Sequence, residues 1–126
     1  MPSLPSEPLR IELSWPAKQL GSNSSVHHMV RHRFRKAARN EAGWATKEAL
    51  QRNRDWAPAG EEVNVHLICQ APTGTVQPDN DGMVYRVKGA LDGIADALGI
   101  NDRLFQAPTV EWGDRCERGK LVVVLT

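Results

Sequence analysis

The chain has 126 residues, of which 25% are charged and 40% are hydrophobic, and its formal net charge at pH 7 is +1. This length allows one domain with a single core and leaves no room for a separate substrate module. The first ten residues, MPSLPSEPLR, lack the basic start and apolar run of a secretory signal, and no run of about 18 apolar residues occurs. We therefore expect a cytoplasmic protein that does not enter a membrane.

The two cysteines, Cys69 and Cys116, are too few for a disulfide framework, and they lack the spacing of a zinc site. We interpret both as buried or incidental thiols.

The small net charge hides a division along the chain. Residues 1–54 contain ten Lys/Arg and four Asp/Glu, a net charge of +6, whereas residues 55–126 contain six and eleven, a net charge of −5. A basic half suits a polyanion, and an acidic half suits a divalent cation. The same division also suits proteins with neither role, so it does not decide the function.

The first half of the chain predicts one strand and one long helix. Leu9, Ile11 and Leu13 alternate with polar residues, which is typical of a half-buried strand. After a loop over 17–25, apolar residues at three-to-four spacing predict a helix from about residue 26 to residue 50. We expect Ser24 or Ser25 to cap this helix, which Gly43 could break.

The second half predicts a strand over 63–70, a Pro/Gly/Asn-rich loop over 71–80, and a second helix that ends at Gly99. Two strands follow, one through Val110 and Trp112 and one over Leu121–Leu125. The order is β-α-β-α-β-β, which predicts an α+β fold: a mixed α/β single layer whose mixed sheet is covered by two helices. We assign residues 1–8 to an N-terminal tail and residues 9–126 to the domain.

Acidic residues flank the second predicted helix. Asp79 and Asp81 precede or begin it, and Asp102 follows it. If the helix begins near Asp81, Lys88 and Asp92 lie within roughly 20° of one line with it, at about 100° per residue. Converging carboxylates of this kind could bind Mg²⁺, while a lysine could neutralise charge on a phosphate. The simpler alternative is an Asx turn with a helix cap and an ordinary surface ion pair.

The first predicted helix carries most of the basic charge, in the run HHMVRHRFRK over 27–36 and in Arg39. Arg31, Arg35 and Arg39 share one face, so they are the expected phosphate contacts, with Arg33 and Lys36 directed elsewhere. The alternative is a solvated helix face that contacts nothing.

The segment PDNDGMVYRVKGALDGIADALGINDRLF resembles the signature of RusA-type Holliday-junction resolvases. That signature has an Asp-x-Asp-Asn before a helix with a Lys and an Asp, and then an Asp-Asp pair. Asp79, Asp81, Lys88, Asp92 and Asn101-Asp102 match it. The strand ending in Trp15-Pro16 and the stretch Leu20-Gly21-Ser22-Asn23 with His27 are similar to phage-type members, so that the resemblance covers about residues 9–126.

The resemblance implies a homodimer that binds branched DNA and resolves four-way (Holliday) junctions by paired symmetric nicks, in DNA recombination and repair. It implies a crossover junction endodeoxyribonuclease in which Asp79, Asp81 and Asp102 bind Mg²⁺, with Mn²⁺ expected to substitute. Lys88 would assist catalysis, and Asp92 would be an accessory residue. The expected DNA contacts are Arg31, Arg35, Arg39, Asn23 and His27, and His27 could equally be structural. The apolar run Leu121–Leu125 is either part of the dimer surface or a central strand.

Three departures from the family pattern keep other interpretations open. Gly82 stands where the family usually has Asn, Lys88 lies about one helical turn later than usual, and Asn101 replaces the first terminal Asp. Gly82 and the displaced Lys88 suggest an alternative, a catalytically inactive RusA-like protein that only binds junctions. A third reading is a globular domain that recognises a protein through its basic helix.

Overall fold

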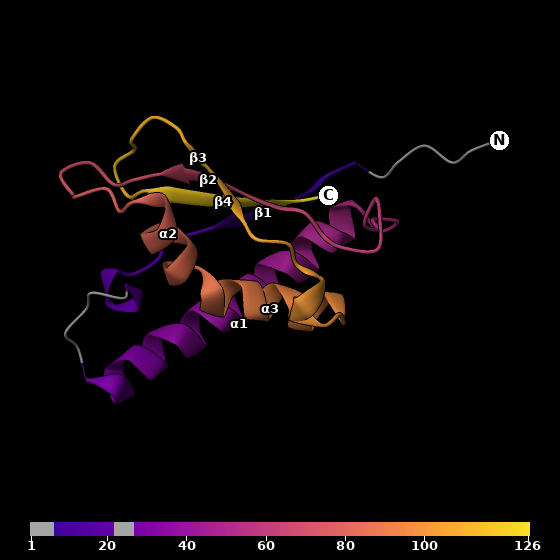
Figure 1. The fold of residues 1–126 in the computed structure, drawn as a ribbon, viewed down its shortest axis with the longest axis horizontal. Coiled ribbons are helices and arrows are strands. Elements are labelled where there is room, and N and C mark those ends of the chain that lie inside the picture. Colours follow the sequence, from indigo (N-terminus) through magenta and orange to yellow (C-terminus); the bar gives the residue numbers. More distant parts are fainter. Residues whose placement is uncertain (1–6, 22–26) are drawn as a thin grey trace.

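The computed structural model describes residues 7–21 and 27–126, which form a four-stranded mixed sheet with helices on one face (Figure 1). The α+β fold class with a mixed sheet is thereby confirmed. The elements in chain order are β1 Leu9–Leu13, the 3-10 helix η1 Lys18–Leu20, α1 His28–Arg52, β2 Val65–Gln70, α2 Asn80–Arg86, α3 Lys88–Leu98, the 3-10 helix η2 Asp102–Leu104, β3 Thr109–Trp112 and β4 Lys120–Leu125.

The strand order in the sheet is β1-β4-β2-β3. β4 runs antiparallel to both of its neighbours, whereas β2 and β3 are parallel. Parallel neighbours need a crossover connection, and here α2 and α3 supply it. Because β4 lies inside the sheet, Leu121–Leu125 is a central strand of the core, and neither of its edges is free for a partner.

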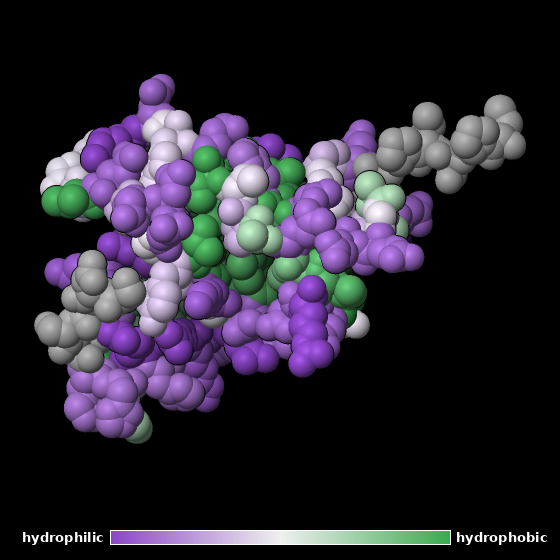
Figure 2. Space-filling view, viewed as in Figure 1, coloured by the Kyte–Doolittle hydropathy of each residue, from purple (hydrophilic) through white to green (hydrophobic). Residues whose placement is uncertain are grey.

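The core lies between the sheet and the helices, and every strand contributes to it through alternate residues. In Figure 2, hydrophobic residues gather in the middle of the view, between the sheet and the helices, and hydrophilic residues cover the outer helix. Register places the inward residues of neighbouring strands side by side, as in the row Ile11, Val123 and Leu67. The inward side chains of β1, β2 and β4 are all buried: Leu9, Ile11, Leu13, Val65, Leu67, Cys69, Leu121, Val123 and Leu125.

Helix α1 starts later than the apolar spacing predicts. Its N-cap is His27, whose Nδ1 accepts a hydrogen bond from the Met29 N–H at 3.2 Å. The predicted caps, Ser24 and Ser25, lie outside the described residues. The helix then runs unbroken past Gly43, so the expected break there is wrong.

Glycine serves close packing between α1 and α3 rather than a helix break. A Cβ atom at Gly93 would overlap the carbonyl oxygen of Arg39, and one at Gly89 would lie 3.2 Å from the carbonyl oxygen of Arg35. The absence of both side chains lets the two helix backbones approach each other closely.

The predicted second helix is two helices. α2 ends at Arg86, Val87 has φ −91° and ψ 1°, and α3 starts at Lys88. Val87 therefore adopts the bridge conformation, which redirects the chain. The apolar spacing hides this break, because Val87 itself and Ile94 after it are both fully buried. Consequently Asp81 does not share one straight helix with Lys88 and Asp92, and the alignment expected for the three is wrong.

Two simpler expectations concern the thiols and membrane helices. Cys69 is buried and Cys116 is half-buried, and both are free thiols. Burial raises the pKa of the Cys69 thiol to about 11. Within the described residues, none of the helices has the length and apolar character needed to cross a membrane.

Candidate nucleic-acid interface

A cationic hollow lies where α1 faces α2 and the first turn of α3. Its volume is about 430 Å³. Its lining includes four cationic side chains and one histidine, namely Arg35, Lys36, Arg39, Lys88 and His32. One acidic side chain, Asp92, also lines it. Tyr85 and Gly89 complete the lining. Cations concentrated in a concave surface attract a polyanion more strongly than the same charges spread over a flat one.

Tyr85 contacts two of the cations that line this cationic hollow. The Nη2 of Arg35 donates a hydrogen bond to the Tyr85 hydroxyl oxygen at 3.3 Å. The Lys88 Nζ lies 5.0 Å from the centroid of the Tyr85 ring. The ring therefore holds one cation from α1 and one from α3 beside each other, through a hydrogen bond and a cation–π contact.

Arg39 connects the cationic hollow with an acidic hollow of about 400 Å³. The acidic hollow also contains Asp92, Asp96 and Asp102. Arg39 Nε donates a hydrogen bond to Asp96 Oδ2 at 2.7 Å, and this bond raises the pKa of the guanidinium. The predicted contact Arg39 thus already has an acidic partner, so a phosphate would have to compete with Asp96 for it.

The start of α2 presents the other two predicted carboxylates. Asp79 is its N-cap, and Asp79 Oδ1 accepts a hydrogen bond from the Gly82 N–H at 2.6 Å. Asp81 lies in the first turn, and both side chains are exposed. Gly82 supports this cap, because a Cβ atom there would lie 2.8 Å from Asp79 Oδ1. The residues around Asp79 are therefore steadied by a contact with the backbone of Gly82.

Contacts from the end of β3 and the loop after it hold the Asp79 loop in place. Trp112 Nε1 donates a hydrogen bond to Asn80 Oδ1 at 2.7 Å. Arg115 donates to the carbonyl oxygens of Pro72 and Thr75, at 2.9 and 2.8 Å. The start of α2 and the loop before it are therefore both held by side-chain contacts.

The predicted site residues fall into two neighbouring groups. Lys88 and Asp92 line the cationic hollow, and Asp92 also lines the acidic hollow with Asp102. Asp81 is four residues before Tyr85 on α2, and such pairs have Cβ atoms about 5–6 Å apart on one helix face. Asp81 is therefore one helical turn from Tyr85 but is not itself among the residues that line the cationic hollow, whereas Asp102 lies beyond the far end of α3.

The donor set at the start of α2 fits a hard cation. Mg²⁺ commonly takes one or two carboxylates and fills its other positions with water and substrate phosphate oxygens. Asp79 and Asp81 are two exposed carboxylates of that kind. Over the described ranges, however, no three or more His, Cys, Asp and Glu side chains form a group that could hold a metal ion. Within one chain, Asp102 therefore does not form a metal-binding group with Asp79 and Asp81.

The basic face of α1 differs in detail from the expectation. Arg35 and Arg39 line the cationic hollow together with Lys36, which was expected to point elsewhere. Arg31 is half-buried and is not among the residues that line this hollow. His27 has the structural role of an N-cap, and Asn23 lies outside the described residues.

Sequence reasoning missed Tyr85 and Asp96. Tyr85 is the chain's single tyrosine and lies between Asp81 and Lys88, and that position was the available signal. Asp96 follows Asp92 by four residues, so the sequence also indicates that the two side chains share one helix face. The pairing of Asp96 with Arg39 could not be predicted from the sequence, because the two residues are 57 positions apart.

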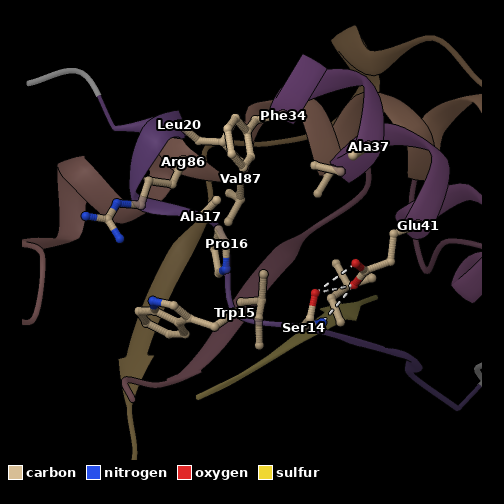
Figure 3. Close-up of a pocket in the computed structure, with 14 residues that line it drawn as sticks. Ser14, Trp15, Pro16, Ala17, Leu20, Phe34, Ala37, Glu41, Arg86 and Val87 are labelled. Atoms are coloured by element: carbon tan, nitrogen blue, oxygen red, sulfur yellow. Dashed lines mark hydrogen bonds between the residues drawn. The ribbon is translucent and has the colours of Figure 1, made fainter. Parts of the chain in front are cut away.

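A mostly apolar hollow of about 140 Å³ lies on the opposite face of α1 (Figure 3). Trp15 and Phe34 form part of its wall, and Arg86 lies at one side. Glu41 accepts hydrogen bonds from both the Ser14 N–H and the Ser14 hydroxyl at 2.8 Å. These contacts join the end of β1 to α1, and none of the predicted site residues lines this hollow.

The protein has an α+β fold. The cationic and acidic hollows share Arg39 of α1 and Asp92 of α3, and together they form a groove of mixed charge between these two helices. No protein-family model matches the chain. A protein of Xylella fastidiosa (strain Temecula1 / ATCC 700964) that carries the name "Uncharacterized protein" is 33% identical over 120 residues. The matched residues are 92% of this chain and 74% of the relative. The chain therefore belongs to the same protein family as this Xylella protein.

Proposed function

We propose that the protein is a Mg²⁺-dependent endodeoxyribonuclease that resolves four-way DNA junctions, as RusA-type resolvases do. The single observation that carries the proposal is the position of Asp81, one helical turn from Tyr85, which lines the cationic hollow. A nuclease needs phosphate-binding cations beside carboxylates that can hold a metal ion, and we infer that the cationic hollow and the start of α2 supply these two parts.

The cationic hollow supplies the DNA-binding part of the proposal. Arg35, Lys36 and Lys88 are exposed there. Each cation that neutralises a phosphate releases condensed counterions and so increases affinity. The hollow would therefore hold the sugar-phosphate backbone, in a manner independent of base sequence.

The carboxylates supply the chemical part. When bound, Mg²⁺ stabilises charge on the phosphate and makes its bound water a better nucleophile. Asp79 and Asp81 would hold the ion at the start of α2. Lys88, held over the Tyr85 ring, would neutralise charge on the phosphate as cleavage proceeds.

The alternative is a RusA-like protein that binds junctions without cutting them. It is favoured by the position of Asp102, which lies with Asp92 and Asp96 rather than with Asp79 and Asp81. In that case the acidic residues would serve only as helix caps and ion-pair partners.

The test is incubation of an end-labelled four-way junction with the protein in Mg²⁺ and, separately, in Ca²⁺. We expect symmetric nicks in Mg²⁺, and binding without product in Ca²⁺. Binding in both metals with no product would support the alternative. An absence of binding at low salt would contradict both functions.

A further inference from the structure

Trp44 is exposed on α1, on the side of the helix that faces the groove. Its exposed fraction is 73%, although a tryptophan side chain gains more from burial than most others. The Lys47 Nζ lies 5.1 Å from the centroid of its ring. An aromatic face and a cation are thus presented together to the solvent.

The ring borders a fourth hollow, of about 270 Å³, which adjoins the cationic and acidic hollows because Arg39 lines all three of these. Gly43 and Gly93 contribute no side chains, and Asn40 and Asp96 supply donors and acceptors. The Trp44 hollow therefore combines an aromatic edge with polar groups in the same groove.

We propose that Trp44 is a stacking platform for a DNA base whose own stacking is interrupted at the branch point. The inference rests on the proposed junction-binding function and deepens it by assigning the part of the substrate that this end of the groove contacts. The base would stack on the indole ring, while Lys47 would neutralise the adjacent phosphate. Base–aromatic stacking of this kind does not depend on base identity, because every base has a π-face.

The surroundings of Trp44 favour a nucleotide over a second protein. An aromatic residue that anchors a protein interface usually lies in a well-packed, desolvated centre. Here the neighbouring side chains Arg39, Asn40, Lys47 and Asp96 are polar or charged. A nucleotide matches this combination because it carries a flat apolar face and an anionic phosphate.

The experiment compares wild type, Trp44→Phe and Trp44→Ala on a four-way junction and on the same sequences arranged as two linear duplexes, which expose the same number of ends. We expect Trp44→Ala to weaken junction binding about five-fold to one-hundred-fold, and duplex binding less than about two-fold. Trp44→Phe keeps an aromatic face and should remain close to wild type. Val76→Ala, which truncates an apolar side chain that is 91% exposed on the loop between β2 and α2, is the matched control and should have no effect.

Fluorescence gives a second measurement that does not depend on junction binding. Titration with a single-stranded oligonucleotide at low salt should quench tryptophan emission in wild type, and the quenched component should be absent from Trp44→Phe. The inference is overturned if wild type binds the junction and Trp44→Ala binds it equally well, or if both DNA forms are weakened alike. It is also overturned if Trp44→Ala converts a dimer to a monomer without DNA, because a second copy would then be the partner.

The same experiment separates failure of the inference from failure of the proposed function. If wild type does not bind the junction but single strands quench Trp44, Trp44 stacks on DNA bases, whereas its assignment to the branch point and the resolvase function are both wrong. If wild type binds neither DNA, both are wrong.

Discussion

Asp79 has two roles that substitution can separate. It caps α2 through Gly82 and, in the proposed function, it also holds a metal ion. Asn is as good an N-cap as Asp, whereas Ala loses about 1 kcal/mol of stability at such a position. We therefore expect Asp79→Asn to melt like wild type and to bind junctions while losing cleavage. Asp79→Ala should lose cleavage and also lower the free energy of unfolding by about 1 kcal/mol.

Denaturant unfolding and the junction-cleavage assay check this pair of variants. Cleavage by Asp79→Asn at the wild-type rate would remove Asp79 from the site. Equal stability of Asp79→Asn and Asp79→Ala would show that the N-cap bond does not stabilise the fold.

Single residues were predictable where local chemistry decides their position. Asp79 and Asp81 follow a Pro/Gly/Asn-rich loop, and the structure has them capping and beginning a helix. The neighbours of the basic residues were not predictable in the same way. Arg39 pairs with Asp96 because α1 packs against α3, and Arg35 reaches Tyr85 of α2 across 50 positions of sequence.

At the scale of elements, the α1–α3 contact tests the fold most sharply. Gly93 is buried, and a Cβ atom there would overlap the Arg39 carbonyl oxygen, so Gly93→Ala should force the helices apart. Overpacking of this kind typically costs about 1–3 kcal/mol. Gly43→Ala is the matched control, because its Cβ would lie 3.7 Å from the Gly93 carbonyl oxygen, an ordinary contact.

Helix propensity alone favours Ala over Gly in both positions by roughly 0.8–1.0 kcal/mol. We therefore expect thermal unfolding to show a lower Tm for Gly93→Ala and an equal or higher Tm for Gly43→Ala. If Gly93→Ala were as stable as wild type, the close packing of the two helices would be wrong.

The strands and the end of α3 were predictable because their signals are local. Alternation identified β1 and β2, and Gly99, with φ 70°, ends α3 as expected. The division at Val87 was not predictable, because the apolar spacing continues through it. The position of β4 between β1 and β2 could not be predicted either, because an apolar run predicts burial but not strand order.

At the scale of the whole molecule, the cationic hollow predicts how binding responds to salt. Arg35→Ala should weaken junction binding and lower the slope of log affinity against log salt by about one unit, the change expected for one lost phosphate contact. Arg33→Ala is the control, since Arg33 is exposed on the same helix and does not line the hollow. Titrations at several salt concentrations measure both slopes. An equal slope for Arg35→Ala and wild type would mean that this hollow does not contact DNA.

The quaternary structure remains a prediction. One chain carries one pair of carboxylates at the start of α2, whereas resolution of a junction requires two cuts in opposed strands. A two-fold dimer doubles the site and matches the symmetry of an open junction. β4 is a central strand, so it cannot extend the sheet by pairing edge to edge with a second copy.

The most direct test of this account combines wild-type and Asp81→Asn subunits in one dimer and offers it a junction labelled on both opposed strands. In Mg²⁺, the wild-type dimer should cut both strands, the mixed dimer should nick one strand, and the Asp81→Asn dimer should bind without cutting. The account is contradicted if wild type binds the junction as a monomer that makes both cuts, or if the wild-type dimer leaves both strands intact.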